Sequence, residues 1–142
     1  MSGMFGSDGV VGGSFNNDVL EAQPTDDASK LKLVDEIKSR AKGCISSGNL
    51  PEAIRLYTKA AELTEHTPPA CAIIYANRSM LHSKMNHFAV AMDDAIVAVE
   101  KDPSYIKGYY RKATASQGLG DFAAAKNALL AGLALKPDDK ET

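Results

Sequence analysis

One regular spacing constrains this chain more than any other feature of its sequence. Three pairs of identical residues lie about 34 residues apart, and a fixed period of this length indicates a repeat architecture. The pairs are Tyr75 and Tyr109, Ala91 and Ala125, and Pro103 and Pro137. Between these landmarks, apolar side chains recur at every third or fourth position, which is the spacing of an amphipathic α-helix. No stretch alternates apolar and polar residues for long enough to indicate a strand. The sequence therefore predicts an all-α chain built from one repeated unit.

The sequence predicts six successive helical segments. The first begins near Thr25, where Thr25, Asp26 and Asp27 offer capping oxygens. Gly48, Asn86 and Gly120 are placed to form the tight turns before alternate segments. Small residues recur after each of these turns, with Tyr57 and Leu129 among the larger side chains expected to fill the gaps between helices: Ala53, Tyr57 and Ala60; Ala91, Ala95 and Ala98; Ala125, Leu129 and Gly132. A helix–turn–helix unit of about 34 residues is the period of the tetratricopeptide repeat.

The fold class that follows is all-α, with three helix–turn–helix repeats at about residues 34–67, 72–105 and 106–139. We expect them to stack as a right-handed superhelical solenoid within a domain of residues 27–137. The interval from Ala53 to Ala91 is longer than the interval from Ala91 to Ala125, because the loop TEHTPPAC carries four extra residues. Pro68 or Pro69 suits the first turn of the helix that follows this loop.

The two ends of the chain do not show the repeat. Residues 1–26 are rich in Gly, Ser, Asn and Asp, contain no Lys or Arg, and predict a disordered acidic tail. The stretch SFNNDVLEA, residues 14–22, is alternatively a short docking motif. At the other end, residues 138–142 predict the start of a missing capping helix or a C-terminal tail, so we expect a fragment of a larger protein.

Charge and chemistry-bearing residues exclude several classes of function. The net charge of −2 does not suit a nucleic-acid-binding protein. Cys44 and Cys71 form no CxxC pair and are expected to be reduced, which favours a cytoplasmic or nuclear location. The longest apolar run, residues 128–135, is too short to predict a membrane span. The three histidines have no partner at metal or triad spacing. We therefore expect no metal, no cofactor and no enzymatic activity in this segment, although a catalytic domain could follow it in a longer protein.

Two stretches carry a more specific resemblance: YANRS, residues 75–79, and YIKGYYRKA, residues 105–113. They resemble the tetratricopeptide domains of co-chaperones such as the Hsp-organising protein and the tetratricopeptide-containing Ser/Thr phosphatase. The second stretch is most similar to the phosphatase version. In this family the first helices of the repeats line a groove that holds the acidic C-terminus Glu-Glu-Val-Asp of a heat-shock chaperone of the 90-kDa or 70-kDa class.

The resemblance also implies a peptide-binding site of five residues that clamps two carboxylates. Four positions of this sequence match the family pattern, namely Lys38, Asn77, Lys107 and Arg111. The fifth position, an asparagine in the family, is Lys42 here. This lysine keeps a donor for a carboxylate but adds one more positive charge, so it either preserves or strengthens carboxylate binding or shifts the peptide and the choice of partner.

The residues themselves support a site for an acidic ligand. Lys38 and Lys42 are separated by one helical turn, as are Lys107 and Arg111, so each pair shares one helix face. Arginine offers a planar fork to a carboxylate, lysine a point charge, and asparagine an amide donor. Met80, Ser83 and Lys84 follow Asn77 on the same expected helix. Met80 is a candidate contact for the peptide valine or a core residue, and Lys84 either reaches an upstream glutamate or is merely solvated.

The sequence thus predicts a protein–protein interaction module, expected to be monomeric, that binds the acidic C-terminal peptide of a chaperone. Two alternatives stay open at this point. One is a scaffold or self-associating repeat protein without such a clamp, which pairs through its last helix. The other is a targeting receptor whose groove reads a different C-terminal signal.

Overall fold

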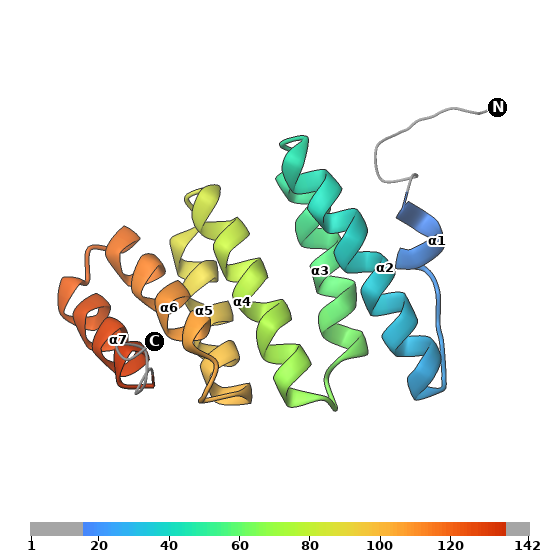
Figure 1. Ribbon diagram of the computed structural model, residues 1–142. Coiled ribbons are helices and arrows are strands. Elements are labelled where there is room, and N and C mark those ends of the chain that lie inside the picture. Colours follow the sequence, from blue (N-terminus) through green and yellow to red (C-terminus); the bar gives the residue numbers. More distant parts are fainter. Residues whose placement is uncertain (1–15, 136–142) are drawn as a thin grey trace, which may run out of the picture. The chain divides into compact units, whose positions relative to one another are not determined.

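In the computed structural model, residues 16–135 are described, and they contain α-helices and connecting turns (Figure 1). They form two compact units, divided between Leu63 and Thr64, which are treated separately below. The helices of the first unit are α1 (Asn17–Leu20), α2 (Asp27–Ser46) and α3 (Leu50–Leu63). Those of the second unit are α4 (Pro68–Lys84), α5 (Phe88–Lys101), α6 (Ile106–Gly118) and α7 (Phe122–Ala134).

The first unit is a helical hairpin of α2 and α3 with the short α1 beside it. The Asp26 side chain caps α2 by accepting a hydrogen bond of 3.0 Å from the Ser29 backbone N–H. Ile37 and Ala41 of α2 are fully buried, as are Ala53 and Leu56 of α3. Their spacing of three and four positions places each pair on one face of its helix, so these faces form the core of the hairpin.

The second unit consists of two further hairpins, α4 with α5 and α6 with α7, and α6 also packs on α4 and α5. Small residues bring these helices close together: Ala91, Ala95 and Ala98 of α5 are fully buried. In α7, a Cβ atom on Gly132 would lie 2.9 Å from Tyr110 Cε1. A larger residue at Gly132 would therefore push α7 away from α6.

The turn residues occupy the backbone conformations that their chemistry suggests. Gly48 and Gly120 have φ values of 83° and 81°, and Asn86 has φ of 63°. Positive φ is easy for glycine and tolerated by asparagine, which explains why these residue types stand at the three equivalent turns. Pro68 and Pro69 lie in the first turn of α4, where a missing N–H costs nothing.

The predicted all-α, helix–turn–helix fold is confirmed, but two details of the prediction are wrong. Leu129 does not fill a gap between helices, because it is 43% exposed on α7. The predicted disorder also fails for residues 16–26, which include α1 and hold Asn16 and Val19 buried against the first unit. The rest of the predicted tail, residues 1–15, and the predicted capping segment, residues 138–142, lie outside the described residues.

Candidate functional site

A cavity of about 290 Å³ opens between α4 and α6 in the second unit. It is lined by Met80, Ser83 and Lys84 of α4 and by Arg111 and Thr114 of α6. Its wall thus combines a flexible apolar side chain, two hydroxyl groups and two cations. This composition fits a ligand with negative charge and some apolar surface.

Two polar atoms of this cavity's residues are buried without a hydrogen-bond partner among residues 16–135. They are Arg111 Nε and Ser83 Oγ. Buried donors are almost always paired in folded proteins, because an unpaired one loses its hydrogen bonds to water without replacement. A ligand carboxylate in the cavity would bring acceptors next to the Arg111 side chain and the Ser83 side chain, which both line it. Because two of its lining residues carry such atoms, this cavity is the candidate binding site of the second unit.

Contacts with α5 fix the orientation of α4. Arg78 forms a bidentate ion pair with Asp94, with Nε–Oδ2 and Nη2–Oδ1 distances of 2.8 and 2.7 Å. The Ser79 hydroxyl donates to the Ala91 carbonyl oxygen at 2.7 Å, and the Arg78 guanidinium lies 5.0 Å from the centre of the Tyr75 ring. These residues hold one face of α4 on α5, which leaves the face of Met80 and Ser83 turned to α6.

The Arg78–Asp94 pair also sets the electrostatics of this packed face. The hydrogen bonds that Arg78 donates to Asp94 raise the pKa of the Arg78 guanidinium. Burial lowers the pKa of His82, whose Nε2 atom lies 4.0 Å from the Asp94 carboxylate, so its neutral form is favoured. His82 is therefore packed on the side of α4 that faces Asp94 of α5.

Close approaches position α6 from both sides. A Cβ atom on Gly108 would lie 3.4 Å from the Val99 side chain of α5, and Gly132 of α7 lies against Tyr109 and Tyr110. The Tyr109 hydroxyl donates to the Pro103 carbonyl oxygen at 2.8 Å and connects α6 to the loop before it. Tyr109 therefore packs within the third hairpin, while Arg111 points to the cavity.

The remaining predicted residues of the second unit lie one turn away from the cavity. Asn77 precedes Met80 by three positions on α4, and Lys107 precedes Arg111 by four on α6, so each continues the cavity-lining face of its helix. Asn77 is half-buried and Lys107 is exposed. The structure thus brings Met80, Ser83, Lys84 and Arg111 together and extends their two faces through Asn77 and Lys107.

Lys38 and Lys42 belong to the first unit, where both are exposed on α2. They are one turn apart on the same face of that helix. Thr114, which the sequence reasoning missed, is one turn beyond Arg111, and this spacing was the available signal.

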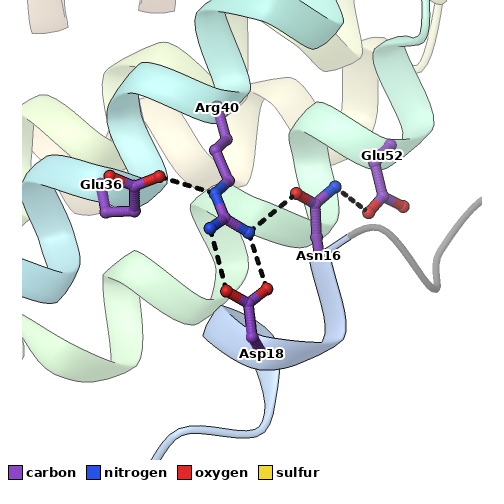
Figure 2. Close-up of polar contacts among 5 residues, drawn as sticks. All are labelled: Asn16, Asp18, Glu36, Arg40 and Glu52. Atoms are coloured by element: carbon purple, nitrogen blue, oxygen red, sulfur yellow. Dashed lines mark hydrogen bonds and ion pairs between the residues drawn. The ribbon is translucent and has the colours of Figure 1, made fainter.

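The sequence reasoning also missed a polar network that joins α1 to α2 and α3 (Figure 2). Arg40 of α2 pairs with Asp18 through two bonds of 2.7 and 2.9 Å and with Glu36 at 2.8 Å. Asn16 donates to Glu52 of α3 at 2.7 Å. The signal in the sequence was an acidic residue followed directly by the apolar pair Val19 and Leu20 within an otherwise polar segment.

Within the described residues, no group of three or more His, Cys, Asp or Glu side chains could hold a metal ion. No helix between residues 16 and 135 is long and apolar enough to cross a membrane. Both cysteines are free, Cys71 buried and Cys44 half-buried, and burial raises the pKa of the Cys44 thiol.

The paired helices, their period and their close-packed small residues define a repeat domain. Residues 106–139 match the tetratricopeptide repeat family, and residues 27–135 form a tetratricopeptide repeat domain. The chain is 37% identical over 111 residues to rat serine/threonine-protein phosphatase 5, covering 78% of this chain and 21% of that protein. It is 35% identical over 108 residues to the wheat Hsp70-Hsp90 organizing protein, covering 76% and 18%. The chain thus spans about a fifth of the length of these relatives.

A solved structure gives the same result for the fold. The second tetratricopeptide domain of Spaghetti (RPAP3), bound to the HSP90 peptide SRMEEVD, superposes with a TM-score of 0.68 at 28% identity. The match covers 77% of this chain and 96% of that chain. The likeness therefore extends over nearly the whole of that peptide-binding domain.

Proposed function

We propose that this domain binds the acidic C-terminal peptide of a heat-shock chaperone, of the 90-kDa or 70-kDa class, and acts as a co-chaperone or chaperone-targeting module. The observation that carries the proposal is the cavity between α4 and α6, which is lined by Arg111, whose buried Nε has no hydrogen-bond partner among residues 16–135. The bound peptide SRMEEVD of the structural neighbour supplies carboxylates of the kind that this donor lacks.

The proposed site uses each residue for a separate purpose. Arg111 holds a carboxylate by its fork, Lys107 adds a positive charge one turn away, and Asn77 donates from α4. Met80 gives the apolar valine a flexible contact, while Lys84 meets an upstream glutamate. Hydrogen bonds to charged groups contribute about 1.5–3 kcal/mol each, so two or three of them account for most of the affinity of a short peptide.

From the resemblance to the carboxylate clamp alone, we also propose Lys38 and Lys42 of the first unit as cations that bind an acidic peptide. Lys42 replaces the amide of the family with an ammonium group. We expect this change to preserve carboxylate binding and to increase its dependence on salt.

The test is isothermal titration calorimetry of the whole chain with the peptide SRMEEVD. We expect micromolar binding that weakens between low and high salt and is lost when the peptide carboxylate is amidated. Amide-shift mapping should place the changes on α4 and α6 around Ser83 and Arg111. Equal affinity for the free and amidated peptides would contradict a carboxylate clamp, and tighter binding to another C-terminal signal would favour a targeting receptor.

The parent protein and the location follow from the same proposal. A phosphatase regulatory domain and a multi-domain chaperone adaptor are the two candidate parents, because both kinds of relative share this domain. A catalytic domain would then lie outside this chain.

We propose the cytosol as the place of action, since the free thiols of Cys44 and Cys71 suit a reducing compartment.

Self-association through the last helix is a second candidate function, because α7 exposes a row of large apolar side chains. Phe122 is 67% exposed, and Leu129, Leu130 and Leu133 are 43–54% exposed. Contiguous apolar surface of this kind often marks an interface. Sedimentation velocity over a hundredfold range of concentration decides the matter: a constant monomer mass would exclude self-pairing, and Leu130→Lys should abolish any dimer.

A further inference from the structure

Residues 16–22, which we call the strap, lie on the first hairpin and are held there mainly by polar contacts. The Asp18 carboxylate accepts from both Nη atoms of Arg40, and the Asn16 amide donates to Glu52 (Figure 2). Lys59 Nζ donates to the Ala22 carbonyl oxygen at 2.7 Å. Three contacts that each join residues distant in sequence thus fix both ends and the middle of this short segment.

The surface under the strap is specific for this pattern of groups. Val19, the residue after Asp18, is only 4% exposed, so the strap presents an acidic and an apolar side chain in succession. Glu52 and Lys59 are each 7% exposed, which is rare for charged residues unless they have partners. Glu52 is shared between Asn16 and Arg55, and Lys59 bonds a main-chain oxygen of the strap. The hairpin therefore carries prepared partners for an amide, a carboxylate and a backbone carbonyl.

Several features of the strap favour reversible docking on the hairpin. Its helix α1 has four residues, fewer than an isolated helix needs to persist, so it forms only on docking. The Asp18 side chain is already exposed while the strap is docked, and Glu52 and Lys59 regain water when it departs, so no charge is left buried without a partner. An open groove lined by Gln23, Pro24, Lys32 and Leu33 separates the segment after the strap from α2, so the link itself packs loosely.

We propose that this face of α2 and α3 is a second peptide-binding surface, which the chain's own strap occupies as a displaceable ligand. Its partner is a short segment of another protein with the chemistry of Asn16–Ala22: an amide, then an acidic residue two positions later, followed directly by an apolar residue. The tether gives the strap an effective concentration of about a millimolar, so a partner must bind more tightly than the strap alone to replace it.

The first experiment measures binding in trans. The probe is a peptide of residues 16–24 with blocked ends, titrated into the full chain carrying Asp18→Lys and Val19→Ser, which opens the strap. We expect the opened chain to bind the peptide at least tenfold more tightly than the unmodified chain does, because its own strap no longer competes. A peptide carrying Asp18→Asn is the matched control and should bind at least fivefold more weakly.

A third variant tests the surface itself: Arg40→Glu, added to the opened chain, should abolish binding of the peptide. Retained helicity by circular dichroism establishes that each variant folds. A folded, opened chain that ignores the peptide would overturn the proposal. A dimer of the unmodified chain by sedimentation, lost in the opened variant, would also overturn it, since the strap would then be exchanged between copies.

The unmodified chain provides a second measurement that needs no variant. Hydrogen exchange of the strap amides should be at least tenfold faster than that of the α2 interior, because the strap opens while the hairpin stays folded. An excess of the blocked peptide should accelerate it further by displacing the strap. Exchange of the strap at the rate of the α2 interior, unchanged by peptide, would show that the strap is a permanent part of the hairpin.

Discussion

Arg40 in the first unit and Arg111 in the second are used in opposite ways. Arg40 has its donors taken up by Asp18, Glu36 and Asn16, and these hydrogen bonds raise its pKa. Arg111 keeps a buried Nε without a partner among the described residues, in a cavity of about 290 Å³. Arg40 thus holds α1 to α2, whereas Arg111 is the arginine that we propose for the binding of an acidic peptide. Arg78, saturated by Asp94, belongs with Arg40.

The role of a charged residue in this molecule follows from its hydrogen bonds rather than from its type or burial. A saturated arginine contributes to stability, and its loss should be visible in unfolding. An unsaturated one contributes little to stability, and its loss should be visible in binding. The substitutions of Asp94, Arg111 and Arg40 below separate the two roles, and each has a neighbouring residue as its control.

The largest effect is expected on breaking the saturated pair in the second unit. Asp94→Ala leaves Arg78 half-buried without its carboxylate, so the free energy of unfolding should fall by about 3 kcal/mol. Urea unfolding followed by circular dichroism measures the loss. Asp93→Ala, at an exposed position next in the chain, should change stability by less than about 0.5 kcal/mol. If both variants lost the same free energy of unfolding, the Arg78–Asp94 ion pair would have no special role in stability.

Arg111→Ala should reverse this pattern. Peptide affinity should fall about 30-fold or more, because a charge-assisted contact with the ligand carboxylate is lost. The free energy of unfolding should stay the same or rise slightly, since the substitution removes a buried donor that has no partner among residues 16–135. Calorimetry and urea unfolding on one preparation give both numbers. Lys112→Ala, at the neighbouring position, is the control and should change neither peptide affinity nor stability. A loss of stability in Arg111→Ala as large as that in Asp94→Ala would contradict the prediction, because Arg111 would then stabilise the fold as Arg40 and Arg78 do.

Arg40→Ala should have a smaller effect, confined to stability. Its ion pairs are largely exposed to solvent, so we expect a loss of about 1 kcal/mol, reduced further in high salt. Affinity for the chaperone peptide should not change. Ser39→Ala, at the exposed neighbouring position, is the control. A tenfold loss of peptide affinity in Arg40→Ala would mean that the strap and the peptide site are coupled.

The ion pair between Asp18 and Arg40 should also make docking of the strap depend on pH. Hydrogen bonds from Arg40 lower the pKa of Asp18 below its usual 3.8. A carboxyl whose pKa is lowered by folding contributes stability above the unfolded pKa and loses it as pH falls through the folded value. The strap should therefore stay docked from neutral pH down to about pH 4 and detach below it. NMR of the Val19 methyl groups reports docking, and Asp18→Asn should remove this transition.

The sequence predicted the repeats well because their signals are local. Gly48, Asn86 and Gly120 indicate turns through backbone conformations that few other residues accept, and the buried alanines indicate close helix packing. The cavity was partly predictable, since Met80 and Arg111 follow from helix register and the resemblance. The absence of a partner for Arg111 Nε among residues 16–135 was not predictable, because pairing depends on which side chains of α4 reach α6.

The strap was missed for a physical reason. A segment rich in polar residues buries little apolar surface, so composition predicts disorder. Residues 16–22 are instead ordered by long-range polar contacts with Arg40, Glu52 and Lys59, whose spacing in sequence carries no periodic signal. A related limit explains why Leu129 was misjudged. Periodicity marks a position on a helix, but not whether a partner element covers it.

The smallest expected effect concerns Lys42, on the same helix as Arg40. Lys42 is exposed on α2 and would act on a peptide carboxylate as a solvated point charge. Lys42→Asn, which restores the residue of the co-chaperone pattern, should change peptide affinity by about threefold at low salt, far less than Arg111→Ala, and by nothing measurable at high salt. Calorimetry on both variants at two salt concentrations measures this difference. A greater loss from Lys42→Asn than from Arg111→Ala would move the centre of the site from the unpaired arginine to the exposed lysines of α2.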